Sequence, residues 1–134
     1  MEKIDFKYQI VNLIETSYRY NYDYSYDGLN KKDVIYRLAN NIKINSDKEI
    51  ISIEYTVRLE APQHIILVED SIVIDYNITP INEIILQMKH GKINTNIPQL
   101  ISTFNNIAIG ALRGILAKNL KSTPLEGCVI PLVQ

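Results

Sequence analysis

The sequence predicts an α+β fold, in which a four-stranded antiparallel sheet is followed by a short helix and a long C-terminal helix. Apolar and polar residues alternate with the period of a strand in the first half of the chain. In the second half the apolar residues change to helical spacing. A short link, residues 61–63, joins the last two predicted strands, which favours an antiparallel pair. The 134 residues fit one core, so residues 1–134 are assigned to a single domain.

Four segments have the composition of β-strands. The first, residues 4–16, mixes aromatic and β-branched side chains with polar ones and opens the sheet, and the second covers residues 34–44. The third, residues 49–59, alternates most clearly and places one set on a buried face: Ile51, Ile53, Tyr55, Val57 and Leu59. The fourth, residues 64–78, does the same with Ile66, Val68, Ile72, Ile74, Tyr76 and Ile78.

Two helices are predicted after the strands. Thr79 and Pro80 have the residue types of an N-cap and a first helical position, and His90 followed by Gly91 closes a short helix of about three turns. Residues 97–120 then predict a helix about 35 Å long. Its apolar residues recur at helical spacing: Ile97, Leu100, Ile101, Phe104, Ile107, Ala108, Ala111, Leu112, Ile115 and Leu116.

Gly110 and Gly114 lie in the middle of this helix. Each glycine costs about 1 kcal/mol of helix propensity, so we expect another element to approach this face closely. Arg113 and Lys118 argue against a helix pair in lipid. The residues leave open whether the partner is the chain's own sheet or another subunit.

The charge balance and the cysteine content argue against several functional classes. Fourteen basic residues nearly balance fifteen acidic ones without a basic cluster, so nucleic acid is not an expected partner. The first residues lack the features of a secretory signal, and the apolar runs are shorter than a membrane span. Cys128 is the single cysteine, which predicts a reducing, cytoplasmic location. The apolar tail, residues 128–133, is expected to pack against the domain.

Side chains that could support catalysis or bind a cofactor are scarce. His64 and His90 have no nucleophile or acid at the spacing of a catalytic triad, and one cysteine with two histidines makes no metal cluster. No glycine-rich phosphate loop occurs. We therefore predict no catalytic residue, no metal and no cofactor. The acidic residues of the sheet are interpreted as solubilising: Glu54, Glu60, Glu69 and Asp70.

A row of tyrosines is the most distinctive feature of the sequence. They occupy every second position up to Asp27: Tyr18, Tyr20, Tyr22, Tyr24 and Tyr26. In an extended chain all five rings would lie on one side. Such a face suits contact with apolar segments of other proteins, but it equally suits a strand packed inside the domain. The residues alone leave both interpretations open.

Several short stretches, taken in their order, resemble the SecB export-chaperone family. Residues 6–10, Phe-Lys-Tyr-Gln-Ile, are similar to the family's opening strand. Residues 67–78, with Leu-Val-Glu at the start and Tyr-Asn-Ile at the end, resemble its fourth strand. Residues 111–131 are similar to its long helix, threonine-containing turn and proline-ending tail, so the resemblance covers nearly the whole chain.

The resemblance implies a chaperone that holds unfolded or extended polypeptides, among them preproteins for export, without catalysis. It implies a homotetramer, built as a dimer of dimers with the long helices at the interface, and here that interface would contain Phe104, Ala108, Gly110, Ala111, Leu112, Gly114 and Ile115. It also implies that the crossover after the first strand lines a client groove. This assigns client contact to Tyr18, Tyr20, Tyr22, Tyr24 and Tyr26.

The sequence departs from the family pattern in two respects. Glu69 matches an acidic position that contacts the SecA motor in the family, but the near-neutral charge weakens the expectation of an acidic docking face. The sequence also ends at Gln134 without the family's C-terminal extension, which makes motor binding doubtful. A protein dedicated to one partner, such as an antitoxin, therefore stays open beside a general holdase. The lack of a nucleophile argues against a third alternative, an enzyme or small-ligand binder.

Overall fold

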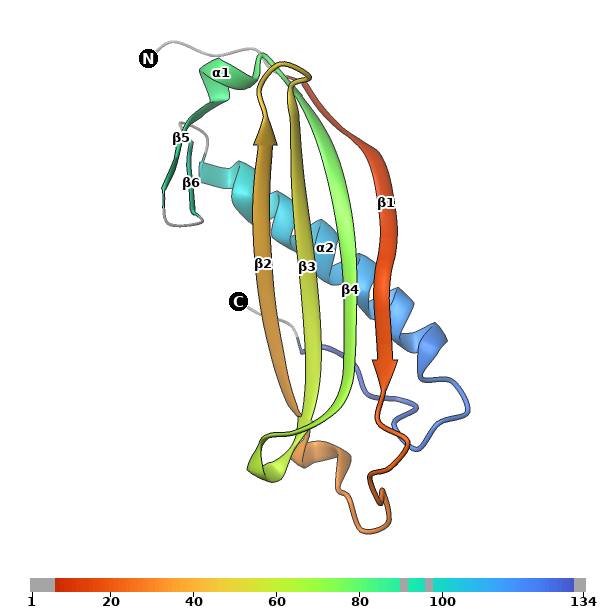
Figure 1. Cartoon of the computed structure of the whole chain (residues 1–134). Coiled ribbons are helices and arrows are strands. Elements are labelled where there is room, and N and C mark those ends of the chain that lie inside the picture. The colour runs from red at the N-terminus through yellow and green to blue at the C-terminus, as the bar shows by residue number, and fades with distance from the viewer. Residues whose placement is uncertain (1–6, 90–91, 96–97, 132–134) are drawn as a thin grey trace.

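The computed structural model describes residues 7–89, 92–95 and 98–131 (Figure 1). Four long strands come first in the chain: β1 (Lys7–Tyr20), β2 (Ile35–Asn45), β3 (Ile50–Ala61) and β4 (Ile65–Thr79). They are followed by α1 (Ile81–Ile84), β5 (Ile85–Lys89), β6 (Lys92–Thr95) and α2 (Pro98–Asn119). Two single 3₁₀ turns, Lys31–Asp33 and Pro62–His64, precede β2 and β4.

The four long strands form one antiparallel sheet in the order β1-β4-β3-β2. The predicted α+β class and the four predicted strands are confirmed, with bounds that differ by a few residues except that β1 continues to Tyr20. The register aligns the apolar positions across the sheet: Ile53 lies opposite Ile74 of β4 and Ile42 of β2. These side chains share one face, the helix side, whereas the opposite face, here called the open face, is largely polar.

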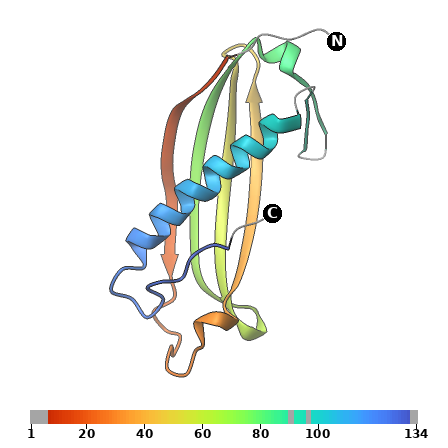
Figure 2. The same cartoon turned by 180° about the vertical axis from the view of Figure 1, so that it is seen from behind.

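α2 packs diagonally across the helix side of the sheet (Figure 2). Every fourth residue from Leu100 on α2 to Leu120, just after its end, is buried in the core: Leu100, Phe104, Ala108, Leu112, Leu116 and Leu120. Phe104 stacks on Tyr76, near the end of β4, with ring centroids 3.9 Å apart, which holds the first part of the helix against the sheet. Burying each of the large side chains contributes about 1.5–3 kcal/mol, so this stripe determines how the helix docks.

The side of α2 that faces away from the sheet carries few charges. Residues Gln99–Asn119 have a mean hydropathy of 1.3, enough by length and composition for a membrane span, and only 28% of the window is buried within the chain. A core helix passes the same test when its apolar stripe packs on a sheet, as this one does. The hydropathy comes from the buried stripe and its half-buried flanks, whereas the exposed outer side carries small and polar residues: Gln99, Ser102, Asn106, Gly110, Gly114, Ala117 and Lys118.

The predicted three-turn helix after Thr79 is wrong. α1 has only four residues, and the chain then forms the hairpin of β5 and β6. β4 extends through Thr79, and the Ile81 amide donates to the Glu49 carboxylate at 3.1 Å instead of being capped by Thr79. Consecutive β-branched residues at 84–85 also favour a strand over a helix. His90 and Gly91, the predicted helix end, lie outside the described residues.

The chain after α2 turns back along the sheet. Leu125, Cys128 and Ile130 are buried, which confirms the predicted packing of the tail as far as residue 131. Nε of Arg113 on α2 donates to the Ile130 carbonyl at 2.9 Å. Figure 2 shows the tail on the same face of the sheet as the helix.

Candidate functional site

The tyrosine row is broken by a turn at Asn21, because β1 ends at Tyr20. The Asn21 side-chain oxygen accepts hydrogen bonds from the amides of Asp23 (3.0 Å) and Tyr24 (3.1 Å). Its side-chain nitrogen donates to the Ile66 carbonyl at 2.9 Å. The predicted extended face of five rings is therefore wrong, since a turn replaces the period of two after Tyr20.

Four of the five rings still gather into a tyrosine cluster: Tyr20, Tyr22, Tyr24 and Tyr26. Tyr20 lies with its ring centroid 4.8 Å from that of Tyr22 and 5.6 Å from that of Tyr26. The Tyr26 hydroxyl donates to the Asn21 carbonyl at 2.6 Å, and burial, with a smaller contribution from Tyr20, raises the pKa of Tyr26. Tyr26 therefore keeps its proton and helps to hold the loop together.

Only Tyr22 offers most of its ring to solvent, with 83% of the residue exposed. Tyr20, Tyr24 and Tyr26 are half-buried and pack against the core. Tyr18 lies close to the cluster, near Tyr20 and Tyr22, and its hydroxyl donates to the Asn119 carbonyl at the end of α2 at 3.2 Å. Of the five predicted client-contact residues, Tyr22 is thus the one whose side chain is placed mainly for an external contact.

A groove of about 810 Å³ opens between β2 and α2, in a region that the sequence did not single out. Its walls come from the helix side of β2 and β3 and from one flank of α2: Leu38, Ala39, Asn40, Tyr55, Ser102, Asn105, Asn106, Ile109 and Leu112. The volume is in the range of pockets that take up drug-sized ligands or short peptide segments. The groove exists because α2 crosses the sheet diagonally, which no local sequence pattern encodes.

The chemistry of the groove suits an uncharged peptide chain. No lining residue is charged, and the side chains of Asn40, Asn105 and Asn106 make no hydrogen bond to any described residue, so their donors and acceptors are free. Such amides match the N–H and C=O groups of a peptide backbone. β2 is the outermost strand of the sheet, so one edge of its backbone has no partner strand among the described elements.

The predicted interface residues of α2 divide into two groups. Phe104, Ala108 and Leu112 are buried in the chain's own core, which argues against the predicted subunit contact through these three, and Leu112 also lines the groove. Gly110 and Gly114 lie on the outer side, where a Cβ added at either glycine would meet no heavy atom within 4 Å. This rules out the sheet as the element that approaches the glycines. Ala111 and Ile115 are half-buried beside them.

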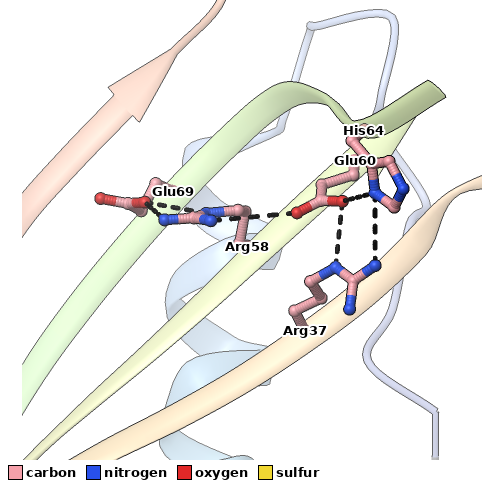
Figure 3. A network of polar contacts seen from close by, with 5 residues as sticks. All are labelled: Arg37, Arg58, Glu60, His64 and Glu69. Atoms are coloured by element: carbon pink, nitrogen blue, oxygen red, sulfur yellow. Dashed lines mark hydrogen bonds and ion pairs between the residues drawn. The ribbon is translucent and has the colours of Figure 1, made fainter. Parts of the chain in front are cut away.

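The open face of the sheet carries a network of charges around Glu60 (Figure 3). The Glu60 carboxylate accepts a hydrogen bond from Arg37 at 3.0 Å and lies 3.4 Å from Nδ1 of His64. The Arg37 guanidinium holds the pKa of the buried Glu60 carboxyl below its usual value. Arg58 donates from Nε and Nη2 to Glu69 at 3.0 and 2.8 Å and lies 3.9 Å from Glu60. The proposed motor-docking carboxylate, Glu69, is thus paired within the chain.

A buried carboxyl joins the end of α2 to β1 and β4. Asp70 is fully buried on the helix side, and the Asn119 amide donates both to Asp70 at 2.9 Å and to Glu15 at 2.8 Å. The second oxygen of Asp70 has no hydrogen-bond partner among the described residues. Burial, followed by the neighbouring Glu15, raises the pKa of Asp70 to about 7. We call Asp70, Glu15 and Asn119 the helix clamp.

Among the described residues, no group of three or more histidine, cysteine, aspartate or glutamate side chains is arranged to hold a metal ion. His64 belongs to the charge network, and His90 lies outside the described residues.

Comparison with known proteins finds a similar fold and no close relative. No protein-family model matches the sequence, and no curated protein does. Among solved structures, the chain is similar to the Mycobacterium tuberculosis Rv1957 SecB-like chaperone in complex with a ChAD peptide from the Rv1956 HigA1 antitoxin. The TM-score is 0.56 at 8% sequence identity, over 95% of this chain and 90% of that chain. The fold is therefore SecB-like.

Proposed function

We propose that this protein binds extended, unfolded polypeptide non-covalently, in the groove between β2 and α2. The observation that carries the proposal is the combination of uncharged walls and unpaired asparagine amides in one cavity, which is lined by the edge strand β2. An extended peptide laid along β2 can use the strand edge for its backbone and the groove for alternate side chains. Tyr22, at the loop before β2, adds an exposed ring for a longer client.

The structural neighbour supports this proposal, because that SecB-like chaperone was solved with a peptide from an antitoxin. It also favours the dedicated alternative, in which the chain serves one partner rather than many unfolded clients. A general holdase should bind unrelated unfolded chains without nucleotide, whereas a dedicated protein should bind one partner tightly. Export of preproteins and docking to the SecA motor stay predictions, and the pairing of Glu69 with Arg58 argues against motor docking through that carboxylate.

We also propose that the chain forms a homo-oligomer through the outer side of α2. The open glycine positions and the apolar flank of this helix fit close packing against a second copy, and a tetramer is the assembly that the resemblance implies. A cytoplasmic location and the absence of catalysis likewise stay part of the proposal.

Placing a charge in the groove tests the site. Leu38→Lys puts an ammonium group into the groove, and Ile35→Lys is the matched control, because both residues lie on β2 with 42% and 41% exposure but on opposite faces. We expect Leu38→Lys to weaken binding of a fluorescent unfolded peptide by about tenfold or more, which is about 1.4 kcal/mol, since a desolvated charge is costly. Ile35→Lys should leave the Kd unchanged.

The same variants are then compared in suppression of aggregation of an unrelated, chemically unfolded protein. A parent that suppresses aggregation, with loss only in Leu38→Lys, supports a general holdase that uses the groove. A folded parent that neither binds the peptide nor suppresses aggregation contradicts general binding and leaves the dedicated partner, which co-purification would then identify. Equal binding by both variants would show that the groove is not the site.

A further inference from the structure

The tail segment, residues 128–131, has the structure of an extended peptide seated on a surface. The structure assigns it neither helix nor turn. Cys128 and Ile130 are buried, with 7% and 1% exposure, whereas Val129 between them is 58% exposed. Alternate burial of this kind is what an extended chain shows when every second side chain points into a surface.

The tail segment lies between the same two elements that form the groove. On β2 it contacts Tyr36, where burial and the adjacent Cys128 raise the tyrosine pKa to about 12. On α2 it is held by Arg113, which donates to the Ile130 carbonyl at 2.9 Å. The tail segment therefore bridges β2 and α2 on the helix side of the sheet.

The groove begins where the tail segment stops. Leu38 is the next residue after Tyr36 on the same face of β2, and Leu112 directly precedes Arg113 on α2. Tail segment and groove thus form two parts of one channel between β2 and α2, of which the tail fills the first part and the groove is the open remainder.

We propose that the tail segment is an internal occupant of the polypeptide-binding channel, and that an incoming client displaces it. This inference rests on the proposed function. The tail segment presents what the groove is suited to bind: an extended, uncharged and apolar chain that buries side chains at alternate positions. Its attachment is small: two buried side chains, the hydrogen bond from Arg113 to the Ile130 carbonyl, and the contacts of Tyr36 with Cys128 and the Val129 backbone. A longer client that uses the whole channel can therefore replace it.

The displacement has two consequences for the client. Arg113 becomes free to donate to a client carbonyl in place of the Ile130 carbonyl. The measured affinity is the intrinsic affinity multiplied by the fraction of molecules whose channel is free of the tail segment, so weakening the tail should strengthen client binding. The tail would thus act as a built-in competitor that selects for clients longer than itself.

Cys128 gives a direct readout in the unmodified protein. It is the single cysteine of the chain, it is free, and it is one of the two buried residues of the tail segment. Its reaction with an aromatic disulfide reagent requires access to the thiol. The probe is a synthetic, cysteine-free peptide of about 12 residues that alternates apolar and neutral polar side chains. We expect saturating peptide to raise the labelling rate at least about tenfold, with an unchanged circular dichroism spectrum.

Two outcomes separate this inference from the proposed function. Peptide binding without any rise in the labelling rate would overturn displacement and leave the proposed function standing. Absence of peptide binding by a folded protein would overturn both.

Two variants of the tail provide the matched comparison. Ile130→Ser removes a buried side chain of the tail segment without touching the groove walls, and Val129→Ser changes its exposed neighbour. We expect Ile130→Ser to raise the basal labelling rate and to lower the peptide Kd about fivefold, whereas Val129→Ser should change neither. A weaker peptide affinity in Ile130→Ser would mean that the tail supports the binding site instead of competing for it. If Ile130→Ser does not fold, the labelling rate of Cys128 in the unmodified protein still shows whether the peptide displaces the tail segment.

Discussion

Replacing Asp70 by asparagine should make the protein more stable at neutral and alkaline pH. Asp70 is buried against Glu15 and Tyr18 of β1 and Asn119 of α2, and Val57 of β3 lies opposite it in the sheet. Its ionised form is therefore surrounded by apolar groups and acidic neighbours, and no cation contacts it among the described residues. Asparagine keeps the size and can still accept the hydrogen bond from Asn119.

The magnitude follows from the pKa shift. The pKa of Asp70 rises from 3.8 to about 7 on folding, which is about 3 pKa units at 1.36 kcal/mol each. The folded protein binds the extra proton, so the free energy of unfolding falls as pH rises between about 4 and 7, and the full loss is present above pH 7. Allowing for relaxation around the charge, we expect Asp70→Asn to gain about 2–4 kcal/mol at pH 8 and almost nothing at pH 4.

Urea unfolding of both proteins at fixed protein concentration, from pH 4.5 to 8.5, measures this difference. Asp75→Asn is the control, because Asp75 lies on the same strand but faces the open side, where Ser52 donates to it at 2.6 Å. In the control, the free energy of unfolding should change with pH between 4.5 and 7 as it does in the parent. A difference between Asp70→Asn and the parent that is constant across the pH range, or a variant less stable than the parent at pH 8, would refute the reasoning.

Two further predictions concern the tyrosine cluster and the outer side of α2. Tyr22→Ser should weaken peptide binding severalfold in a fluorescence titration, with little change in the free energy of unfolding. Tyr26→Ser should instead lower the free energy of unfolding in urea by about 1–3 kcal/mol. Tyr26 packs on Tyr20 and Tyr24, and its hydroxyl donates to the Asn21 carbonyl. The reverse order would show that Tyr22 is structural. Gly114→Leu should lower the light-scattering mass if copies pack through this face; a monomeric protein should instead keep its mass and gain about 1 kcal/mol from helix propensity.

The strands and the long helix could be predicted because their signals are local. Ile51 to Leu59 alternate along one strand, and the stripe from Leu100 to Leu116 repeats along one helix, so neither depends on knowing the neighbours. The prediction of the short helix was wrong because the local signals conflict. Thr79 and Pro80 favour the start of a helix, but two β-branched residues follow, and the chain forms the hairpin of β5 and β6 instead. The strand order and the diagonal path of α2 arise from tertiary packing, so the periodicity of apolar residues in the sequence could not predict them.

The candidate site was predicted less well, for the same physical reason. A helical stripe that contains Phe104, Ala108 and Leu112 is equally consistent with a core and with a subunit interface. Only the structure shows that this stripe packs against the chain's own sheet. The period of two in the tyrosine row assumes an extended chain, but the side chain of Asn21 offers its own hydrogen bonds to the backbone and turns it. The groove could not be found, because Asn40 and Asn106 meet only through the fold.

The two faces of the sheet are suited to different tasks. On the open face, Glu60 and Glu69 are paired with Arg37 and Arg58, so these carboxylates are already engaged within the chain. On the helix side, α2 leaves part of β2 uncovered, and the tail segment covers only some of that part. The helix itself is held by its core stripe and, at its end, by the clamp of Asp70, Glu15 and Asn119. A client can therefore displace the tail segment without undocking α2, because Leu112 is the one residue that the core stripe shares with the groove walls, and neither the stripe nor the clamp includes a residue of the tail segment.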